Sequence, residues 1–262
     1  MGRQQQIIDD RSIISYLDEG QGEPLLFIHG FTGTATADHA GLMDEFRPTH
    51  RLIGPDLRGY GASRPPNRDF PVDFYQRDAA DMAALLDAIN CGPVIVLGFS
   101  DGAEVSLLLA AMRPDLVRGV VAWGVCGVIS PEELQAVQSW LPLTNWDEVR
   151  PEWKRHIIER HGAEQFEPMI TGWLGAARGI YERGGDISYN PSNRIQCPVL
   201  IMNGDGEVGN TPRDVRRLAE RIPNCRLEFV VDSGHPIHKD QPALFNARVR
   251  DFVNGLEEKL QK

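Results

Sequence analysis

The feature that most constrains this chain is an apolar run that passes directly into Gly-x-Ser-x-Gly. Val94-Ile95-Val96-Leu97 leads into Gly98-Phe99-Ser100-Asp101-Gly102, and a helix-like run over 103–112 follows without a break. A buried strand that turns at once into a helix forces the turning residue into a strained conformation. We therefore expect the two glycines to be small because strand and helix crowd together there, and the hydroxyl of Ser100 to be exposed at the positive end of the helix.

Composition excludes several classes of partner. The formal net charge is −10 over 262 residues, which argues against nucleic acid and anionic membranes as partners. The first residues lack the apolar core of a signal peptide, and no run of 18 apolar residues occurs. The four cysteines show no C-x-x-C spacing and are interpreted as reduced thiols. We expect a cytoplasmic protein, and the sequence does not specify its oligomeric state.

The residues before Ser100 predict short strands alternating with helices. The predicted elements are a hairpin over 5–18 with a turn at Asp9-Asp10, a buried strand over 24–28, a helix over 37–46, a strand over 51–54, and a helix that ends near 89 and that Asp73 can cap. A further buried strand over 119–124 follows the helix after Ser100. This alternation predicts a mainly parallel sheet covered by helices on both faces.

The segment over 128–194 interrupts this alternation. It contains only helix-like runs, over 131–141, 147–161 and 165–183, and four of the five tryptophans. We interpret it as a helical cap, a lid over a pocket, inserted into a core made of 1–127 and 195–262; the alternative is that these are ordinary supporting helices. The alternation then resumes with strands over 197–204 and 227–231 and helices over 211–221 and 242–259.

A serine hydroxyl needs a base to take its proton and an acid to orient that base. His235 is the candidate base, because it follows the last predicted strand and Gly234 lets the backbone turn there. His238, three residues further on, is the alternative. The remaining histidines outside the strand ends are interpreted as surface residues: His39, His50, His156 and His161.

The acid should follow the preceding strand. Glu207 comes three residues after Gly204, which is the usual arrangement in such loops, and Asp205 is the alternative. An oxyanion hole needs two backbone N–H groups near the serine. Asp101, the residue after the nucleophile, supplies one, and Phe31, which follows His29-Gly30, is placed to supply the other.

Together these motifs closely resemble the α/β-hydrolase superfamily over nearly the whole chain. His29-Gly30-Phe31 looks like its oxyanion loop, the segment Pro55 to Ser63 looks like its loop after the fourth strand, and 98–102 is similar to its nucleophile elbow. The acid and base loops follow in the family's order of nucleophile, acid and histidine. The resemblance implies an eight-stranded, mostly parallel sheet. The chain departs from the pattern in two ways: a glutamate stands where aspartate is commoner, and the loop from there to Pro212 is one residue longer.

Within the superfamily, Ser100-Asp101-Gly102 and the segment 121–124 resemble the valacyclovir hydrolase (biphenyl hydrolase-like) group. This resemblance implies that the side chain of Asp101 holds a substrate α-amino group and places Trp123 among the substrate-binding residues. The alternative is that Asp101 is only a helix-start residue, favoured by the helix dipole, with its side chain in solvent.

We therefore expect a serine esterase that cleaves a small-molecule carboxylic ester through an acyl-enzyme on Ser100. The alternatives are a carbon–carbon bond hydrolase, perhydrolase or lactonase with the same triad, or a small-molecule binding protein on the same fold. The sequence contains no metal-ligand spacing and no phosphate-binding loop, so we expect neither a metal nor an organic cofactor.

Overall fold

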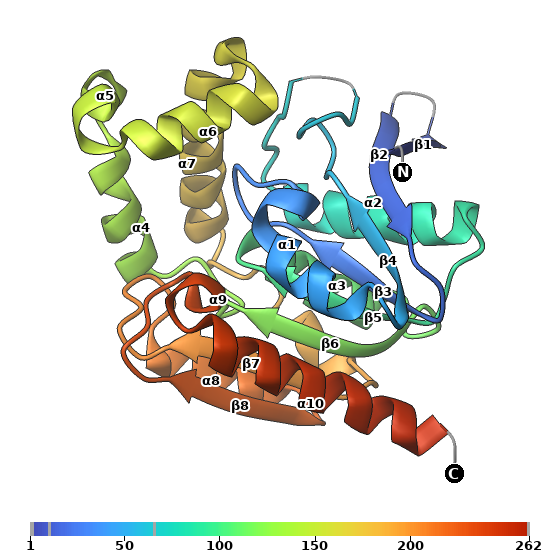
Figure 1. Cartoon of the computed structure of the whole chain (residues 1–262). Coiled ribbons are helices and arrows are strands. Elements are labelled where there is room, and N and C mark those ends of the chain that lie inside the picture. Colours follow the sequence, from blue (N-terminus) through green and yellow to red (C-terminus); the bar gives the residue numbers. More distant parts are fainter. Residues whose placement is uncertain (1–2, 10–11, 65–66, 261–262) are drawn as a thin grey trace.

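One sheet of eight strands runs through the computed structural model, which describes residues 3–9, 12–64 and 67–260 (Figure 1). The strand order is β1-β2-β4-β3-β5-β6-β7-β8. β1 pairs with β2 and β2 with β4 in antiparallel fashion, and every later pair is parallel. The strands are β1 (Gln4–Asp9), β2 (Ser12–Glu19), β3 (Glu23–Ile28), β4 (His50–Pro55), β5 (Val94–Phe99), β6 (Val117–Trp123), β7 (Val199–Gly204) and β8 (Cys225–Val230). The predicted mostly parallel, eight-stranded fold is confirmed.

Helices cover both faces of this sheet. The helices that pack on it are α1 (Ala35–Phe46), α2 (Phe74–Ala88), α3 (Asp101–Met112), α8 (Pro212–Arg221) and α10 (Pro242–Leu260), with the short α9 (Ile237–Asp240) before the last. Residues along β3 alternate between two apolar cores, because successive strand side chains point to opposite faces. Leu25 and Phe27 pack with α1 and α10, whereas Leu26 and Ile28 pack with α2 and α3.

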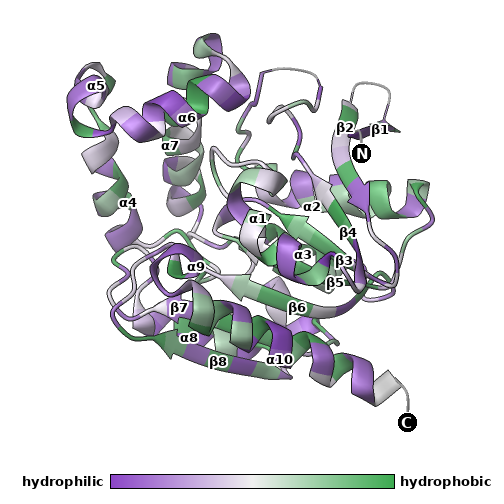
Figure 2. Ribbon diagram, viewed as in Figure 1, coloured by the Kyte–Doolittle hydropathy of each residue, from purple (hydrophilic) through white to green (hydrophobic). Residues whose placement is uncertain are grey.

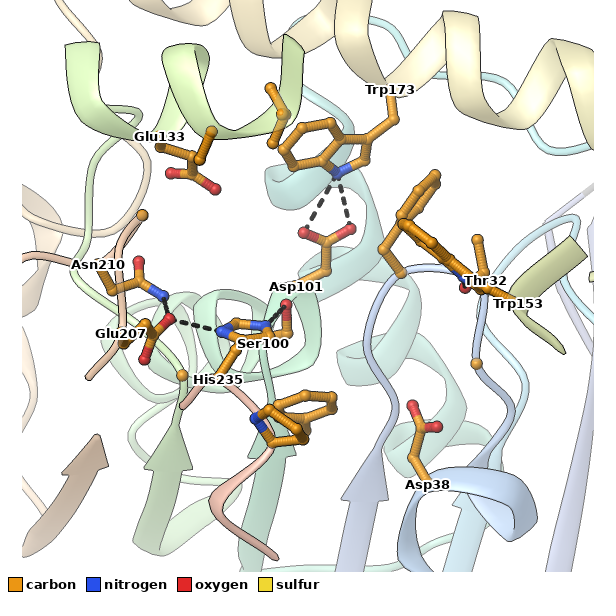
Figure 3. Close-up of a pocket in the computed structure, with 18 of the residues that line it drawn as sticks. Thr32, Asp38, Ser100, Asp101, Glu133, Trp153, Trp173, Glu207, Asn210 and His235 are labelled. Atoms are coloured by element: carbon orange, nitrogen blue, oxygen red, sulfur yellow. Dashed lines mark hydrogen bonds and ion pairs between the residues drawn. The ribbon is translucent and has the colours of Figure 1, made fainter. Parts of the chain in front are cut away.

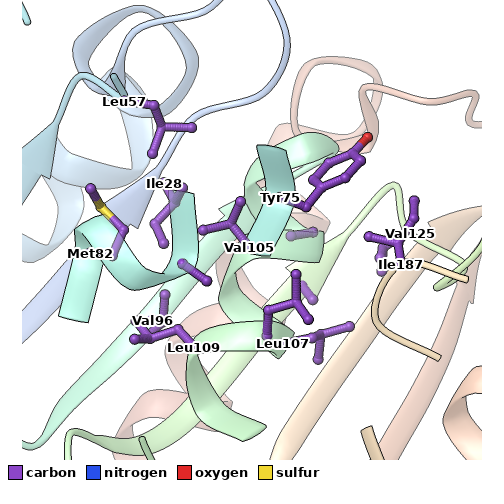
Figure 4. Packing of buried hydrophobic residues seen from close by; sticks show 14 of the residues in the cluster. Ile28, Leu57, Tyr75, Met82, Val96, Val105, Leu107, Leu109, Val125 and Ile187 are labelled. Atoms are coloured by element: carbon purple, nitrogen blue, oxygen red, sulfur yellow. The ribbon is translucent and has the colours of Figure 1, made fainter. Parts of the chain in front are cut away.

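The central strands are mostly hydrophobic, as expected for parallel strands covered on both faces (Figure 2). Figure 4 shows from close by the core that contains Leu26 and Ile28, with Val105, Leu107 and Leu109 of α3 packed among residues of β3, β5 and α2. Every residue of α3 from Asp101 to Ala111 is buried. This helix is buried on all sides because it lies between the sheet and other helices, and most of its residues are apolar.

Some local predictions need correction. The hairpin over 5–18 is formed, but the Asp10 part of its predicted turn lies outside the described residues. Asp73 stands at the N-cap position of α2 without a side-chain capping bond. Helix α1 begins two residues earlier than predicted, because the side chain of Thr34 caps it by accepting from the amide of Ala37.

A helical insertion joins β6 to β7. It comprises α4 (Pro131–Val137), η1 (Gln138–Trp140), η2 (Leu143–Asn145), α5 (Trp146–Val149), α6 (Pro151–His161), η3 (Ala163–Gln165), α7 (Phe166–Glu182) and η4 (Pro191–Arg194), the η elements being 3₁₀ turns. In Figure 1, α4 to α7 stand beyond the carboxyl ends of the central strands. In the described part of the chain, no helix is both long and apolar enough to cross a membrane.

Candidate active site

Ser100 occupies a sharp turn between β5 and α3, in a backbone conformation that L-residues rarely adopt (φ 56°, ψ −121°). A Cβ on Gly98 would lie 2.3 Å from the carbonyl oxygen of Gly102, and one on Gly102 would lie 2.2 Å from that of Ile28. Both glycines are therefore required by close packing, as the sequence predicts. The strain at Ser100 is sustained because strand, helix and neighbouring loop leave the backbone no alternative.

His235 lies beside this serine. Its Nε2 is 2.9 Å from Oγ of Ser100, and its Nδ1 is 2.5 Å from Oε1 of Glu207 (Figure 3). A Cβ on Gly124 would lie 2.9 Å from the imidazole ring, so the residue that follows β6 must be a glycine for the ring to fit. Parallel strands bring the loops after β5, β7 and β8 to one edge of the sheet, which is why residues so far apart in sequence meet here.

Two asparagines hold Glu207. Asn203, on β7, donates to Oε2 over 3.0 Å, and Asn210 donates to Oε1. Burial by itself would lower the pKa of His235, but the charge and hydrogen bond of Glu207 outweigh it, and the pKa is raised above its usual value. A proton on Nδ1 is thereby favoured, which leaves Nε2 able to accept the proton of Ser100.

The two alternatives considered from sequence lie elsewhere. Asp205 is exposed, and its amide continues the sheet by donating to the carbonyl of Val230. His238 accepts a hydrogen bond at Nδ1 from the indole of Trp123, 3.0 Å away, and burial lowers its pKa to about 3. The structure therefore brings Glu207 and His235, rather than Asp205 and His238, into line with Ser100.

The loop after β3 lies against the elbow. A Cβ on Gly30 would be 3.1 Å from the Cβ of Ser100, so the backbone amide of the next residue, Phe31, lies close to the serine. In the described part of the chain, the amides of Phe31 and Asp101 donate to no protein acceptor. Two free N–H groups beside a nucleophile are the arrangement that an oxyanion hole needs.

Several groups fix this loop. The amide of Leu57 donates to Nε2 of His29, whose Nδ1 therefore donates to the carbonyl of Gly30 over 2.8 Å. The carboxylate of Asp38, in the first turn of α1, accepts from the amide of Gly30 over 3.0 Å. Neither His29 nor Asp38 is part of the expected triad, and both act by holding the backbone on which the Phe31 amide is carried.

A cavity of about 710 Å³ opens above these groups, between the sheet edge and the insertion. Ser100, Asp101, Glu207 and His235 line its floor. The insertion contributes the aromatic side chains of the roof, namely Trp140, Trp153 and Trp173. Four further carboxylates line it, those of Asp38, Glu104, Glu133 and Glu152.

The side chain of Asp101 lies in this cavity and not in solvent. The residue is 7% exposed, and its carboxylate accepts from the hydroxyl of Tyr75 over 2.7 Å and from the indole of Trp173 over 3.0 Å. Burial raises its pKa to about 6, against the lowering effect of the Tyr75 bond. The sequence alternative of a solvent-facing helix-start residue is therefore wrong.

Trp123 does not line the cavity. It is fully buried in the core between the sheet and the helices α1 and α10, with its ring against Phe99 and Phe245. A role for its side chain in binding substrate is incompatible with this position. Successive side chains of β6 point to opposite faces of the sheet, and this alternation directs the side chain of Trp123, the last residue of the strand, into the core.

Three of the four histidines interpreted as surface residues are buried: His39, His50 and His161. His39 bonds the carbonyl of Ile28, and His50 lies 2.8 Å from a carboxylate oxygen of Glu257. His161 accepts from the amide of Gly61 and donates to the carbonyl of Thr32. Each of these buried rings has at least one hydrogen-bond partner. His156 is partly exposed and lines the cavity.

Sequence reasoning missed the residues that position the site. Asn203 and Asn210 hold Glu207, Tyr75 and Trp173 hold Asp101, and Asp38 holds the Gly30 amide. A Ser-Asp-Gly elbow gives no sign of which distant donors reach its aspartate. No group of three or more His, Cys, Asp or Glu among the described residues is arranged to hold a metal ion.

Known proteins resemble this chain in sequence and architecture. The model of the Alpha/beta hydrolase family matches residues 25–248. The chain is 29% identical over 243 residues to the serine hydrolase BPHL of Mus musculus, covering 92% of this chain and 82% of that protein. It is 36% identical over 259 residues to a 2-hydroxymuconate semialdehyde hydrolase of Pseudomonas sp. (strain CF600), covering 90% and 88%.

A solved structure supports the fold. A thermophilic esterase from Thermogutta terrifontis, with malate bound, superposes with a TM-score of 0.74 at 21% identity and covers 98% of this chain and 99% of its own. The family match spans most of the chain, and the relatives align along nearly all of it. The resemblance seen in the sequence is thereby confirmed, and this protein belongs to the alpha/beta hydrolase family.

Proposed function

We propose that this hydrolase cleaves carboxylic esters through an acyl-enzyme on Ser100, with His235 as general base, Glu207 as the orienting acid, and the amides of Phe31 and Asp101 as the oxyanion hole. The observation that carries the proposal is the unbroken chain of hydrogen-bond distances from Ser100 to His235 to Glu207. A protein that only bound its ligand would have no need of a base facing a hydroxyl.

The steps follow from these positions. Nε2 of His235 takes the proton of Ser100 as Oγ attacks the ester carbonyl, and the negative oxygen that forms accepts from the two free amides. The imidazolium then gives its proton to the departing alcohol oxygen, and the carbon–oxygen bond breaks to leave the acyl-enzyme. A water, deprotonated by His235, releases the carboxylic acid and restores Ser100.

We further propose that residues 128–194 act as a cap that shapes the substrate site. Support comes from the three insertion tryptophans that line the cavity and from the hydrogen bond between Trp173 and Asp101. The expected cytoplasmic location still rests on the sequence alone.

The side chain of Asp101 is the proposed site for a substrate α-amino group. It lies at the cavity floor directly after the nucleophile, and its two donors leave carboxylate lone pairs for a third. A charge-assisted contact of this kind contributes about 1.5–3 kcal/mol, so an amino acid ester should be favoured by roughly ten- to a hundredfold in kcat/KM.

The test compares phenylalanine methyl ester with methyl 3-phenylpropionate in the wild type, Ser100→Ala and Asp101→Asn. We expect both esters to be cleaved by the wild type, the amino ester faster, and neither by Ser100→Ala. The preference should disappear in Asp101→Asn. Turnover that survives in Ser100→Ala would refute the acyl-enzyme. Equal rates in the wild type would refute only the amine site, because the amide of Asp101 is unaffected.

A further inference from the structure

Glu133 differs from the other carboxylates of the cavity in having no partner. It lies in the first turn of α4, and Figure 3 shows its carboxylate directed from that helix toward the space above Ser100 and His235. Asp101, Glu104 and Glu207 each accept hydrogen bonds from protein donors. Within the described part of the chain, the carboxylate of Glu133 accepts none and forms no ion pair.

An ordinary structural role does not explain this orientation. Ser130 and Glu133 have the spacing of a capping box, in which the glutamate side chain reaches back to the amide of the serine. Only half of that box forms: Oγ of Ser130 accepts from the amide of Glu133 over 3.0 Å. Glu132 in the same turn already supplies negative charge for the helix dipole and faces Arg213.

The position of Glu133 is fixed beside the site. The hydroxyl of Ser130 donates to the carbonyl of Gly209 over 3.2 Å, and a Cβ on Gly209 would lie 3.6 Å from Cγ of Glu133. The start of α4 is thus docked on the loop that carries Glu207. The residue is only partly exposed.

The charges around Glu133 are of one sign. Its pKa is raised well above the usual value, first by burial and then by Glu104, Asp101 and Glu207. Like charges held together in a partly buried site favour the neutral, protonated form of Glu133 until a cation enters. A positively charged group that reached Glu133 from the cavity would relieve that repulsion and supply its missing partner.

We infer that Glu133 and Asp101 form a two-point site for substrates with two ammonium groups, the α-amino group at Asp101 and a side-chain ammonium at Glu133. The inference rests on the proposed function and narrows it to esters of diamino acids. Both carboxylates line the same cavity, and the length of the methylene chain that joins the two ammonium groups is the variable that the experiment scans.

The experiment measures kcat/KM for the methyl esters of 2,4-diaminobutyrate, ornithine and lysine against norleucine methyl ester, which has the same α-amino group and a neutral side chain. In the wild type we expect one of the diamino esters to be favoured over norleucine by about tenfold, mainly through KM. Glu133→Gln should abolish this preference, so that kcat/KM for the diamino ester falls to that for norleucine methyl ester. Glu132→Gln, one residue away and outside the cavity lining, should retain it.

Equal rates for the diamino and norleucine esters in the wild type, or a preference that survives Glu133→Gln, would overturn the inference. A Tm of Glu133→Gln at or above that of the wild type shows that the variant is folded. Should no ester be cleaved in a Ser100-dependent way, the proposed function fails separately. Calorimetric binding of lysinamide against norleucinamide, in wild type and Glu133→Gln, then decides the site by itself: tighter lysinamide binding that requires Glu133 supports it, and equal binding refutes it.

Discussion

The floor of the cavity is formed by the catalytic candidates around Ser100, and its roof by the tryptophans of the insertion. These two regions hold their side chains by different means. On the floor, backbone packing fixes Ser100, because Gly98 and Gly102 leave no space for another arrangement. In the roof, tryptophans of the insertion pack on one another and on Phe31, whose ring stacks on that of Trp140 with centroids 5.6 Å apart. Aromatic contacts of this kind bury large areas but tolerate small shifts of the rings.

Several polar bonds join the insertion to the sheet domain, and two of them end on one residue. Trp153 donates to Oγ1 of Thr32 over 2.8 Å, and His161 donates to the carbonyl of Thr32 over 3.0 Å. Thr32 directly follows Phe31, so the roof is attached to the loop that carries the proposed oxyanion hole. The comparison indicates that changes on the floor act on chemistry, whereas changes in the roof act mainly on substrate fit. They reach the chemistry through contacts such as those at Thr32 and the bond from Trp173 to Asp101.

The largest effect should come from the floor. Ser100→Ala and His235→Ala should each reduce ester turnover by roughly 10³-fold or more, because members of a triad act as a unit. His238→Ala is the matched control: its ring bonds Trp123 and not Ser100, and turnover should change by less than about fivefold. A His235→Ala enzyme that keeps most of its activity would remove His235 from the mechanism.

Glu207→Gln should reduce turnover by about 10²–10³-fold, because an amide no longer stabilises the imidazolium or fixes its tautomer. Asp205→Asn, at an exposed position in the same loop, should have little effect.

Activity requires neutral His235, so kcat/KM falls as the pH drops through its pKa, which Glu207 raises. In Glu207→Gln this acid limb should move to lower pH. An unmoved limb, or greater damage from Asp205→Asn, would reverse the assignment.

At the oxyanion loop, Asp38→Ala should lower kcat by about tenfold with little change in KM, since the Gly30 amide loses its acceptor and the adjacent Phe31 amide loses its fixed position. Asp38→Asn keeps an acceptor oxygen and should recover most of the rate. Steady-state kinetics of the two variants, with thermal melts to verify folding, test this. Equal losses in both variants would show that the charge matters and not the hydrogen bond.

The smallest effect should come from the roof. Trp153→Phe keeps an aromatic ring but removes the indole N–H that bonds Thr32; a hydrogen bond of this kind contributes about 1 kcal/mol. We expect a rise of a few-fold in KM and a nearly unchanged kcat. A fall in kcat as large as that of Asp38→Ala would show that the roof controls the oxyanion loop, and the distinction between the two regions would fail.

Much of the fold and part of the candidate site could be predicted because they depend on local pattern. Strand–helix alternation predicted the sheet, and Gly-x-Ser-x-Gly predicted the elbow, which the structure forms with Ser100 at φ 56°. The buried histidines could not be predicted in this way. His161 lies at the end of a polar-faced helix, and its partners are the backbone of residues 61 and 32, about a hundred or more positions away.

The sequence by itself determined what nearest neighbours along the chain enforce: the strained serine, the two crowded glycines and the order of the candidate acid and base. Tertiary structure alone decided what depends on packing across the fold. It placed the side chain of Trp123 in the core and set the donors Tyr75 and Trp173 on Asp101. It also brought Glu207, which the sequence favoured over Asp205, to His235. The physical reason is the separation along the chain of the residues that each interaction joins. Backbone sterics act between adjacent residues, whereas burial and hydrogen-bond partnership depend on which distant segments the folded sheet brings to one edge.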